Sequence, residues 1–295
     1  MYIITKIKGG LGNQLFAYAA AKRLAIKNNV ELLIDNTSGF NKRDRYNRSY
    51  LLDSFAIEDR KASYFEKLEP LGRIRRSIKK YLSKNLPFDN RSYLTQEGID
   101  FDERLLNFRV KQNTYIEGYW QSQNYFLDVQ DKIRSNLKMK LPNDKYCLSM
   151  YDKIKSCNSV AVHFRDFTIH DATVGINLTK EYYKKAIAFY ENNYELPFYF
   201  FFSDSTNFLK NLDIDYPQNR SEFLLENINK NNDYLDLWLM SNCKHFVIAN
   251  STFSWWGAWL SQNKNKQVIS PNNNIRYGVN YWGFRGLIPN SWKII

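Results

Sequence analysis

Cysteine and histidine are scarce in this chain of 295 residues. It has three cysteines, Cys147, Cys157 and Cys243, and no two of them show the CxxC spacing. An odd number without this spacing argues against a disulfide framework and a zinc site, and it favours buried thiols in a reducing compartment. Three histidines are also too few for a convincing imidazole-based metal site.

Long apolar runs are missing as well. The most apolar stretch, Pro197–Phe202, is far shorter than the roughly 20 residues that a membrane span needs. The first residues, MYIITKIKGG, contain no apolar run long enough for a signal peptide. We therefore expect a soluble, cytoplasmic protein.

Acidic residues are outnumbered by basic ones. Asp and Glu number 30 against 42 Lys and Arg, which gives a net charge of +12 and a pI near 9.4. Such an excess predicts an anionic partner: a phosphate, a nucleic acid or an acidic membrane surface. The basic run Arg73–Lys84 lies outside any nucleic-acid-reading motif, so a solvated helix face or a membrane-surface patch fits it better. We expect no nucleic-acid partner.

The chain is nevertheless rich in core-forming residues, with 44% hydrophobic and 16% aromatic, which excludes a disordered class. The first half opens as a β–α–β unit, continues as loops and short helices, and returns to regular structure near residue 114. We expect strands at Tyr2–Ile7, Glu31–Ile34 and Thr114–Glu117, helices at Asn13–Lys27 and Ser122–Met139, and loops and short helices over Thr37–Arg76.

A break at Leu141–Asp144 is our domain boundary, dividing the chain into residues 1–143 and 144–295. The second half alternates apolar strands with helices, which predicts a parallel sheet covered on both faces. Two such domains would hold a ligand in a cleft at the carboxyl ends of their strands. The expected strands are Ser159–Phe164, Phe198–Phe202, Glu222–Leu225, His245–Ile248 and Gln267–Ser270, and the helices Lys180–Asn193, Tyr234–Cys243 and Thr252–Gln262.

Four segments carry chemistry, and the first is the glycine-rich turn GGLGNQLFAYAAAK at Gly9–Lys22. Gly10 and Gly12 allow a ligand to approach the backbone where a helix begins, and the free N–H groups there favour anions. It is not a dinucleotide fingerprint, because the third glycine is missing. The alternative is a tight turn with Asn13 as the helix cap.

The second segment is VAVHFRDF, where an apolar strand ends in His163, Arg165 and Asp166. A guanidinium at the carboxyl end of a strand can bind phosphate oxygens in bidentate fashion. Asp166 pairs with Arg165 or acts as a base. The alternative is a surface Arg–Asp pair beside a half-buried, hydrogen-bonded His163.

The third segment, FVIANSTFSWWGAWLS, runs from a strand into a helix at Asn250–Thr252. Hydroxyls and free N–H groups at this helix start would grip a diphosphate, although Ser251 and Thr252 also fit a purely capping role. The tryptophans that follow fit a role in the core.

The fourth segment is FYFFFSDS, in which Asp204 follows a buried strand and either contacts a ribose or base, or caps a helix. Two Asp-x-Asp patterns, Asp100–Asp102 and Asp213–Asp215, are short enough to arise by chance, and we interpret both as solvated turns.

Together these residues resemble the α-1,2-fucosyltransferases of glycosyltransferase family 11, especially the bacterial members. The resemblance rests on GGLGNQLFAYAAAKRLA, YIEGYWQSQNYF, the strand ending in HFR, FYFFFSDS and NSTFSWWGAWLS, which together span nearly the whole chain. It implies an α/β fold of GT-B type, with two facing Rossmann-like domains around a cleft. It also implies an inverting, metal-independent transfer of fucose from GDP-β-L-fucose to the 2-hydroxyl of a galactoside.

The resemblance also implies roles for particular residues. Arg165 would bind the donor diphosphate beside His163, and Asp204 would lie near the nucleoside. Gly10, Gly12 and Asn13 would face the donor from across the cleft. The phosphate-binding hydroxyls would be those of Ser251, Thr252 and Ser254.

One departure concerns the donor loop. The family pattern runs His-x-Arg-Arg-Gly-Asp-Tyr, whereas here Arg165 is followed directly by Asp166 and Phe167. The second arginine and the glycine are therefore absent. This departure keeps two alternatives open: a fucosyltransferase of another linkage, and a GDP-sugar-binding protein with weakened catalysis.

The remaining catalytic and acceptor-binding roles are hypotheses based on the chemistry of the side chains. Arg165, Asp166 and Asn13 are the expected catalytic residues, with Asp166 as base and His170 and Asp171 behind it. Contacts to the acceptor are expected from Tyr119, Trp120 and Gln121, with core packing as the alternative for Trp120. The acceptor would be a galactose-terminated oligosaccharide or a lipid-linked glycan, and the positive charge would favour peripheral contact with an anionic membrane. The other classes left open are a dinucleotide-dependent oxidoreductase and a nucleic-acid binder.

Overall fold

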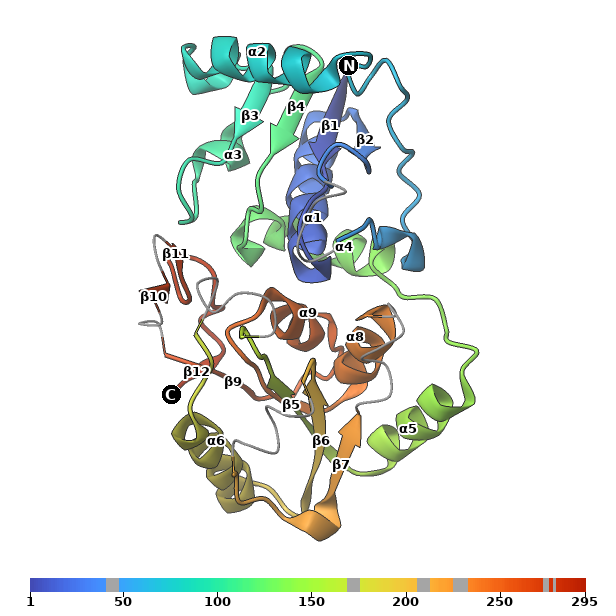
Figure 1. Ribbon diagram of the computed structural model, residues 1–295, viewed down its shortest axis with the longest axis vertical. Helices are drawn as coiled ribbons and strands as arrows, with labels where there is room; N and C mark the ends of the chain where they lie inside the picture. Colours follow the sequence, from blue (N-terminus) through green and yellow to red (C-terminus); the bar gives the residue numbers. More distant parts are fainter. Residues whose placement is uncertain (41–47, 169–175, 206–212, 225–232, 273–275, 278–279) are drawn as a thin grey trace. The chain divides into compact units, whose positions relative to one another are not determined.

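The computed structural model describes residues 1–40, 48–168, 176–205, 213–224, 233–272, 276–277 and 280–295 (Figure 1). The chain divides into two compact units. The first comprises Met1–Lys140 together with Arg285–Leu287, and the second comprises Leu141–Phe284 together with Ile288–Ile295. The division falls three residues before the expected boundary, and a short segment near the end of the chain returns to the first unit.

The first unit is built on a four-stranded parallel sheet of order β2-β1-β4-β3. Three of its strands, β1, β2 and β4, are predicted from the sequence, whereas β3 is not, and α1 connects β1 to β2. The strands are β1 (Tyr2–Lys6), β2 (Glu31–Asp35), β3 (Tyr93–Thr95) and β4 (Thr114–Glu117), and α1 spans Leu11–Asn28.

Other helices of the first unit are shorter than expected in one place and longer in another. The helix α2 (Gly72–Lys84) has 13 residues and begins inside Thr37–Arg76, where loops and short helices are expected. The continuous helix predicted over 122–139 is wrong, because Phe126 and Val129 have extended φ angles of −143° and −133°. That segment forms two 3-10 turns, Gln123–Tyr125 and Leu127–Val129, followed by α4 (Gln130–Asn136). The remaining short helices described in this unit are α3 (Arg104–Asn107) and the 3-10 turns Leu52–Ser54 and Phe88–Asn90.

The second unit is built on a six-stranded parallel sheet of order β12-β9-β8-β5-β6-β7. This is the 3-2-1-4-5-6 order of a doubly wound nucleotide-binding fold, with β5 as its first strand. In Figure 1 the arrows of β6 and β7 point to the same end of the sheet. The strands are β5 (Asn158–Phe164), β6 (Pro197–Ser203), β7 (Ser221–Leu224), β8 (His245–Val247), β9 (Val268–Ser270) and β12 (Lys293–Ile294), with a separate hairpin of β10 (Arg276–Tyr277) and β11 (Asn280–Tyr281).

Helices and aromatic side chains fill the faces of this sheet. Trp255, Trp256 and Trp259 are at most 3% exposed, so their role in the core is confirmed. Among the helices that the structure describes, none has the length and apolarity to cross a bilayer. The helices of this unit are α5 (Lys145–Ser156), α6 (Lys180–Asn193), α8 (Asp233–Asn242) and α9 (Thr252–Leu260).

Candidate active site

The carboxyl edge of the second sheet brings the second, third and fourth sequence segments together. Strand order reverses at β5, with β6 and β7 on one side and β8, β9 and β12 on the other. Open parallel sheets bind ligands at the carboxyl ends beside such a reversal. Arg165 follows β5, Asp204 follows β6, and Asn250 lies three residues after β8, so all three are at this edge.

Arg165 and Asp204 form an ion pair there. The register of β5 and β6 places Phe164 opposite Ser203, so the next residue of each strand is the arginine and the aspartate. The pair remains partly open to solvent, with side-chain exposures of 31% for Arg165 and 26% for Asp204. Because a guanidinium has five N–H donors in a planar fork, this pairing leaves donors for diphosphate oxygens.

The carboxylate of Asp166 does not pair with Arg165 but organises the loop after β5. It accepts hydrogen bonds from the backbone N of Thr168 at 2.9 Å and from Asn177 Nδ2 at 3.1 Å. Burial raises the pKa of Asp166, but hydrogen bonds from Thr168, Asn177 and Ser205 outweigh this and hold that pKa below its usual value. A carboxylate of low pKa is a weak general base, so the geometry favours loop positioning.

Two residues of this loop need separate mention. His170 and Asp171, expected behind Asp166, lie outside the described residues. Asn177 was not singled out from the sequence, because an isolated asparagine carries no motif. Its Oδ1 accepts from the backbone N of Phe167 at 2.8 Å, so it holds the loop from both sides.

His163 is a buried, neutral histidine at the end of β5. His163 is 5% exposed. Burial and the positive charge of Arg165 lower the pKa of His163 to about 3. Its ring lies 5.6 Å from that of Phe253. Nδ1 has no hydrogen-bond partner among the described residues, so one ring nitrogen is buried and unsatisfied.

Asn250 presents a second unsatisfied atom. It is 3% exposed, and its Nδ2 donates to the backbone O of Ile176 at 2.9 Å. A carbonyl oxygen only accepts, so this bond fixes which end of the amide is Nδ2. The remaining atom, Oδ1, has no partner among the described residues. A carbonyl in this position can bind only a donor group, such as a hydroxyl or an N–H.

The start of α9 is capped by its own residues. Ser251 Oγ accepts from the backbone N of Phe253 at 3.3 Å, which confirms the capping role. Ser254 is fully buried, accepts from the N of Ala249 at 3.2 Å and donates to the O of Ser251 at 3.3 Å. Its hydroxyl therefore shapes the turn, and the expected contact of Ser254 with donor phosphates stays a prediction. Thr252 is the first helical residue, and N–H groups in the first turn of a helix can bind anions.

The first sheet also reverses its order, between β1 and β4. The glycine-rich turn follows β1 and the segment from Tyr119 to Gln121 follows β4. Gln121 Nε2 donates to Asn13 Oδ1 at 2.7 Å, which joins the two segments directly. Residues predicted from separate motifs are thus brought together within this unit.

Asn13 is not the helix cap. The N-cap of α1 is Gly10, with a φ of −71°, and Asn13 is the third residue of the helix, while Gly12 is buried in its first turn. The left-handed residue is Gly9, with a φ of +79°, where a Cβ would lie 3.1 Å from Asn13 Nδ2 and 3.2 Å from the ring of Tyr119. Position 9 therefore favours glycine, because its φ is left-handed and the side chains of Asn13 and Tyr119 leave little room for a Cβ.

Tyr119 and Trp120 have opposite environments. Gln96 Oε1 accepts from their backbone N atoms at 2.9 and 3.0 Å and fixes the turn. Tyr119 is half-buried, whereas Trp120 is 1% exposed and packs edge-on against Tyr125 at 5.5 Å. Trp120 is a core residue, so its ring is not available to a sugar.

A charged cluster beside Tyr119 was not predicted from the sequence. Glu117 lies 3.3 Å from Lys6 Nζ and 3.4 Å from Lys8 Nζ, and it accepts a 2.7 Å hydrogen bond from Tyr93 Oη. Burial raises the pKa of Glu117, but Tyr93 and the lysines dominate and lower it to about 2. Lys8 Nζ also lies 5.1 Å from the centre of the Tyr119 ring. The sequence did not indicate this cluster, since Lys6 ends β1, Lys8 follows it, and Glu117 ends β4, more than 100 residues later.

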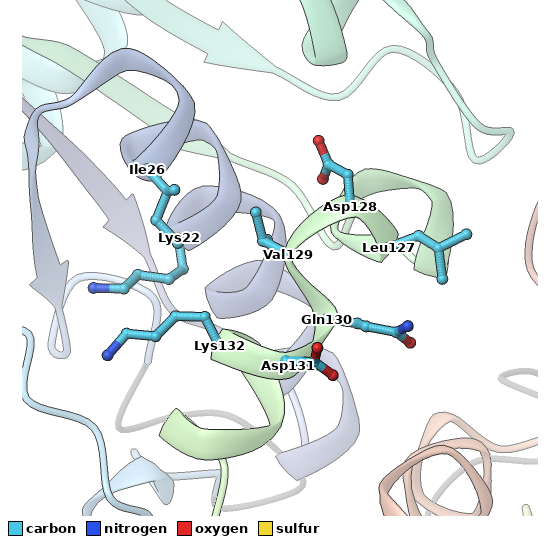
Figure 2. Close-up of a pocket in the computed structure, with 8 residues that line it drawn as sticks. All are labelled: Lys22, Ile26, Leu127, Asp128, Val129, Gln130, Asp131 and Lys132. Atoms are coloured by element: carbon cyan, nitrogen blue, oxygen red, sulfur yellow. The ribbon is translucent and has the colours of Figure 1, made fainter. Parts of the chain in front are cut away.

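A surface hollow lies away from these strand ends (Figure 2). Two of its four charged residues have ion-pair partners: Lys22 pairs with Asp59 at 2.6 Å, and Asp128 pairs with Arg23 at 2.9 Å and Lys27 at 3.0 Å. We therefore do not assign the active site to it. The lining residues are Lys22, Ile26, Leu127, Asp128, Val129, Gln130, Asp131 and Lys132.

The Asp-x-Asp patterns have structural partners. Asp102 pairs with Arg104 at 2.7 Å, and Asp213 and Asp215 are at least 92% exposed beside Lys180 and Lys184. Within the described ranges, no group of three or more His, Cys, Asp or Glu side chains is arranged to hold a metal ion.

Comparison with known proteins gives these features a context. An alpha-1,2-colitosyltransferase of Escherichia coli is 28% identical over 284 residues, covering 91% of each chain. The O-antigen biosynthesis glycosyltransferase WbnK of Escherichia coli is 30% identical over 306 residues, covering 94% of this chain and 98% of its own.

A solved structure shares the fold. The alpha-1,6-fucosyltransferase NodZ of Bradyrhizobium, soaked with GDP-fucose, aligns with a TM-score of 0.51 at 14% identity, covering 88% of this chain and 92% of its own. The expected α/β fold class of GT-B type, with two parallel sheets, is thereby confirmed. The family model for glycosyl transferase family 11 matches residues 2–277. Its match over nearly the whole chain shows that this protein belongs to glycosyl transferase family 11.

Proposed function

We propose that this chain transfers L-fucose from GDP-β-L-fucose to the 2-hydroxyl of a galactoside, with inversion and without a metal. The observation that carries the proposal is the strand-end cluster of the second unit, where Arg165, Asp204, His163 and the start of α9 meet beside the strand-order reversal. It offers cationic and N–H donors at the position where such folds bind nucleotides.

In this mechanism the chain stabilises the leaving GDP. Negative charge develops on the β-phosphate as the sugar–phosphate bond breaks, and hydrogen-bond donors fixed in advance lower the energy of that state. Arg165 supplies a guanidinium held by Asp204, and α9 supplies the N–H groups of its first turn. Both are positioned by the sheet rather than by the ligand.

The sugar side of the reaction needs the opposite charge. Glycosyl transfer passes through an oxocarbenium-like state, which an ionised carboxylate stabilises. Asp166 stays ionised at neutral pH because its pKa is lowered. In our proposal it fixes the Arg165 loop and stabilises this positive charge. Because the basicity of Asp166 is low, the acceptor hydroxyl releases its proton to water as the new glycosidic bond forms and GDP departs.

The unsatisfied atoms of His163 and Asn250 support a donor with polar hydroxyls or N–H groups. Asn250 Oδ1 accepts only, so it suits a hydroxyl of the ribose or sugar, or an N–H of the base. His163 Nδ1 can accept or donate according to its tautomer. We propose that both atoms contact the donor.

The acceptor is assigned to the first unit. Tyr119 is half-buried, and Gln121 is bonded to Asn13, so an aromatic face and an amide lie together after β4. An aromatic face can pack on a sugar ring, and an amide can hydrogen-bond to sugar hydroxyls. The homologous O-antigen glycosyltransferase favours a lipid-linked or free oligosaccharide as the acceptor.

Donor identity has one close alternative. The relative named as an alpha-1,2-colitosyltransferase uses colitose, which is L-fucose without its 3-hydroxyl. Rejecting a sugar that lacks a hydroxyl requires a protein group that is left unpaired by its absence. Rates with GDP-fucose and GDP-colitose therefore decide between the two donors.

The test is GDP release from GDP-fucose, with and without lactose or N-acetyllactosamine, in the presence of EDTA. Acceptor-dependent release supports the proposal, and NMR of the product determines the linkage. GDP binding by calorimetry without transfer to any galactoside would favour the binding-protein alternative, which rests on the missing second arginine. Absence of both binding and release would refute a GDP-sugar site.

A further inference from the structure

The helix α2 has its apolar side turned outward. Four of its apolar residues, Ile74, Ile78, Tyr81 and Leu82, are spaced at i, i+4, i+7 and i+8, which places them on one face. Their exposures are 55%, 55%, 70% and 60%, and Leu71 at the N-cap is 64% exposed. A helix that packed in the usual way would bury these residues against the sheet.

Polar contacts hold the opposite face against the unit. Gly72, Arg76 and Ser83 are the buried residues of α2. Arg76 hydrogen-bonds to the backbone O of Lys67 and lies 3.3 Å from Glu69 Oε1, and Ser83 Oγ lies 3.4 Å from Ser92 Oγ. These contacts fix the orientation of the helix, so the exposed apolar face belongs to the fold itself. Figure 1 draws α2 at the edge of the first unit.

Basic side chains flank the apolar face and no acidic residue occurs in the helix. The sequence GRIRRSIKKYLSK carries six basic residues over 13 positions. Arg73, Arg75 and Lys84 are exposed and have no ion pair within the described part of the chain. At 100° per residue, Arg75 and Lys79 border one side of the face, and Arg73, Lys80 and Lys84 border the other.

We propose that α2 docks this protein on a bilayer that contains anionic lipid. An apolar face bordered on both sides by Lys and Arg is the pattern of helices that lie in the membrane interface. The apolar side chains would enter the boundary between headgroups and acyl chains, while the basic residues would meet lipid phosphates. A second copy of this chain fits less well, because two such basic faces would repel each other.

The experiment is flotation of the full chain with vesicles of phosphatidylcholine, with or without about a third of phosphatidylglycerol. We expect binding to the mixed vesicles and little to the neutral ones. The triple variant Ile74→Ser, Ile78→Ser and Leu82→Ser should lower the partition coefficient at least tenfold. The variant Arg73→Gln with Arg75→Gln should lower it roughly fivefold per arginine, and raised salt should act in the same direction.

Matched controls use residues outside the helix. Leu141→Ser with Leu148→Ser removes two side chains that are 76% and 41% exposed, and Lys132→Gln with Lys138→Gln removes the same charge as the arginine variant. Both should bind vesicles as the unaltered chain does. Because the altered side chains are exposed, we expect every variant to fold. Melting curves followed by circular dichroism check this.

Three results would overturn the proposal. One is no flotation of the unaltered chain with anionic vesicles. Another is flotation that the helix variants and the controls reduce equally. The third is a dimer in sedimentation equilibrium that the triple serine variant dissociates, since the face would then be an interface between copies. The measurement does not depend on sugar transfer, so its outcome is independent of the proposed function.

Discussion

Arg165 is the residue on which the proposed chemistry depends most, and its position follows from strand register. Because Phe164 lies opposite Ser203, the two residues that follow meet as an ion pair. The aspartate that is adjacent in sequence, Asp166, turns instead toward Thr168 and Asn177. A neighbour across the sheet thus takes the place of the neighbour along the chain.

Arg165→Ala should lower kcat/KM by about a hundredfold or more, because removing one donor to developing negative charge costs this much. Asp204→Asn should lower it less, and the double variant should lose less than the product of the two, because both act through one guanidinium. Arg220→Ala is the matched control. Arg220 pairs with Glu191 at 2.7 Å with a similar exposure of 23%, but it lies before β7, at the amino end.

For Arg165→Ala the unfolding free energy should change little, since a half-exposed ion pair contributes about 1 kcal/mol or less. Near-normal turnover in Arg165→Ala, or equal losses in Arg165→Ala and Arg220→Ala, would contradict the diphosphate role. Steady-state kinetics and urea melts give both quantities.

His163 predicts how stability depends on pH. Its pKa is about 3 in the folded chain and near 6.5 when unfolded. The unfolded state therefore binds the extra proton between these values, and stability falls as the pH drops below about 6.5, by up to about 1.4 kcal/mol per pH unit. His245, with a pKa of about 4, adds a second contribution of the same sign.

His163→Gln should halve this slope between pH 6 and pH 5 and leave the slope from His245 in place. Urea denaturation at several pH values measures it, and His245→Gln is the comparison variant. An unchanged slope in His163→Gln would mean that the imidazole is charged in the folded chain.

At the level of elements, the long apolar strands were the most predictable part. The sequence predicts β5 and β6 to within one residue at each end, because near-continuous apolar runs bounded by polar residues leave few alternatives. The helix α6 agrees residue for residue. The edge strand β3 was missed, since its three residues give too short a pattern.

Errors in the helices have local causes. The break at Leu141–Asp144 predicts only a domain boundary, whereas Asp144 is the N-cap of α5 and accepts from the N of Cys147 at 2.9 Å. The helix expected from residue 122 is interrupted where Tyr125 and Phe126 turn into the core, at most 1% exposed. Tertiary burial outweighed local periodicity there.

The contact of α8 with α9 gives the element-scale prediction. A Cβ on Gly257 would lie 2.4 Å from Met240 Sδ and 2.8 Å from Met240 Cγ. Gly257→Ala should therefore destabilise the second unit by about 1–3 kcal/mol through overpacking. Met240→Ala makes room, so the double variant should cost less than the sum of the singles. Additive losses in urea denaturation would show that the helices do not meet at this point.

At the scale of the whole molecule, the chain passes between its two units three times, after residues 140, 284 and 287. The returning segment is bound tightly within the first unit. Phe101 N donates to Arg285 O at 2.9 Å, Ser122 Oγ donates to Gly286 O at 2.6 Å, and Leu287 is fully buried. The first unit is therefore not a continuous stretch of sequence.

Gly286→Ala should loosen this segment. Gly286 has a φ of +90°, and a Cβ there would lie 2.6 Å from Phe101 Cβ. Gly98→Ala is the matched control, because its φ of +79° carries a similar backbone cost and nothing lies within 4 Å of its Cβ position. Gly286→Ala should lose about 1–3 kcal/mol more than Gly98→Ala, as backbone displacement adds to left-handed strain.

Hydrogen exchange at residues 285–287 and thermal melting measure this difference. Equal losses of unfolding free energy in the two variants would mean that residues 285–287 shift to make room for the added Cβ at no energetic cost. Faster exchange confined to Gly286→Ala would show that these three residues hold their place through the contact with Phe101.

Because the first unit consists of two separate stretches of sequence, it limits which chimaeras of two related proteins can fold. A chimaera joined once, at residue 140, would place the Arg285–Leu287 segment of one parent against Phe101 and Ser122 of the other. Exchange of the first unit between relatives would then need two separate gene segments from one parent, or matching residues at both places. Single-crossover shuffling should accordingly yield folded products only between parents that agree at these contacts.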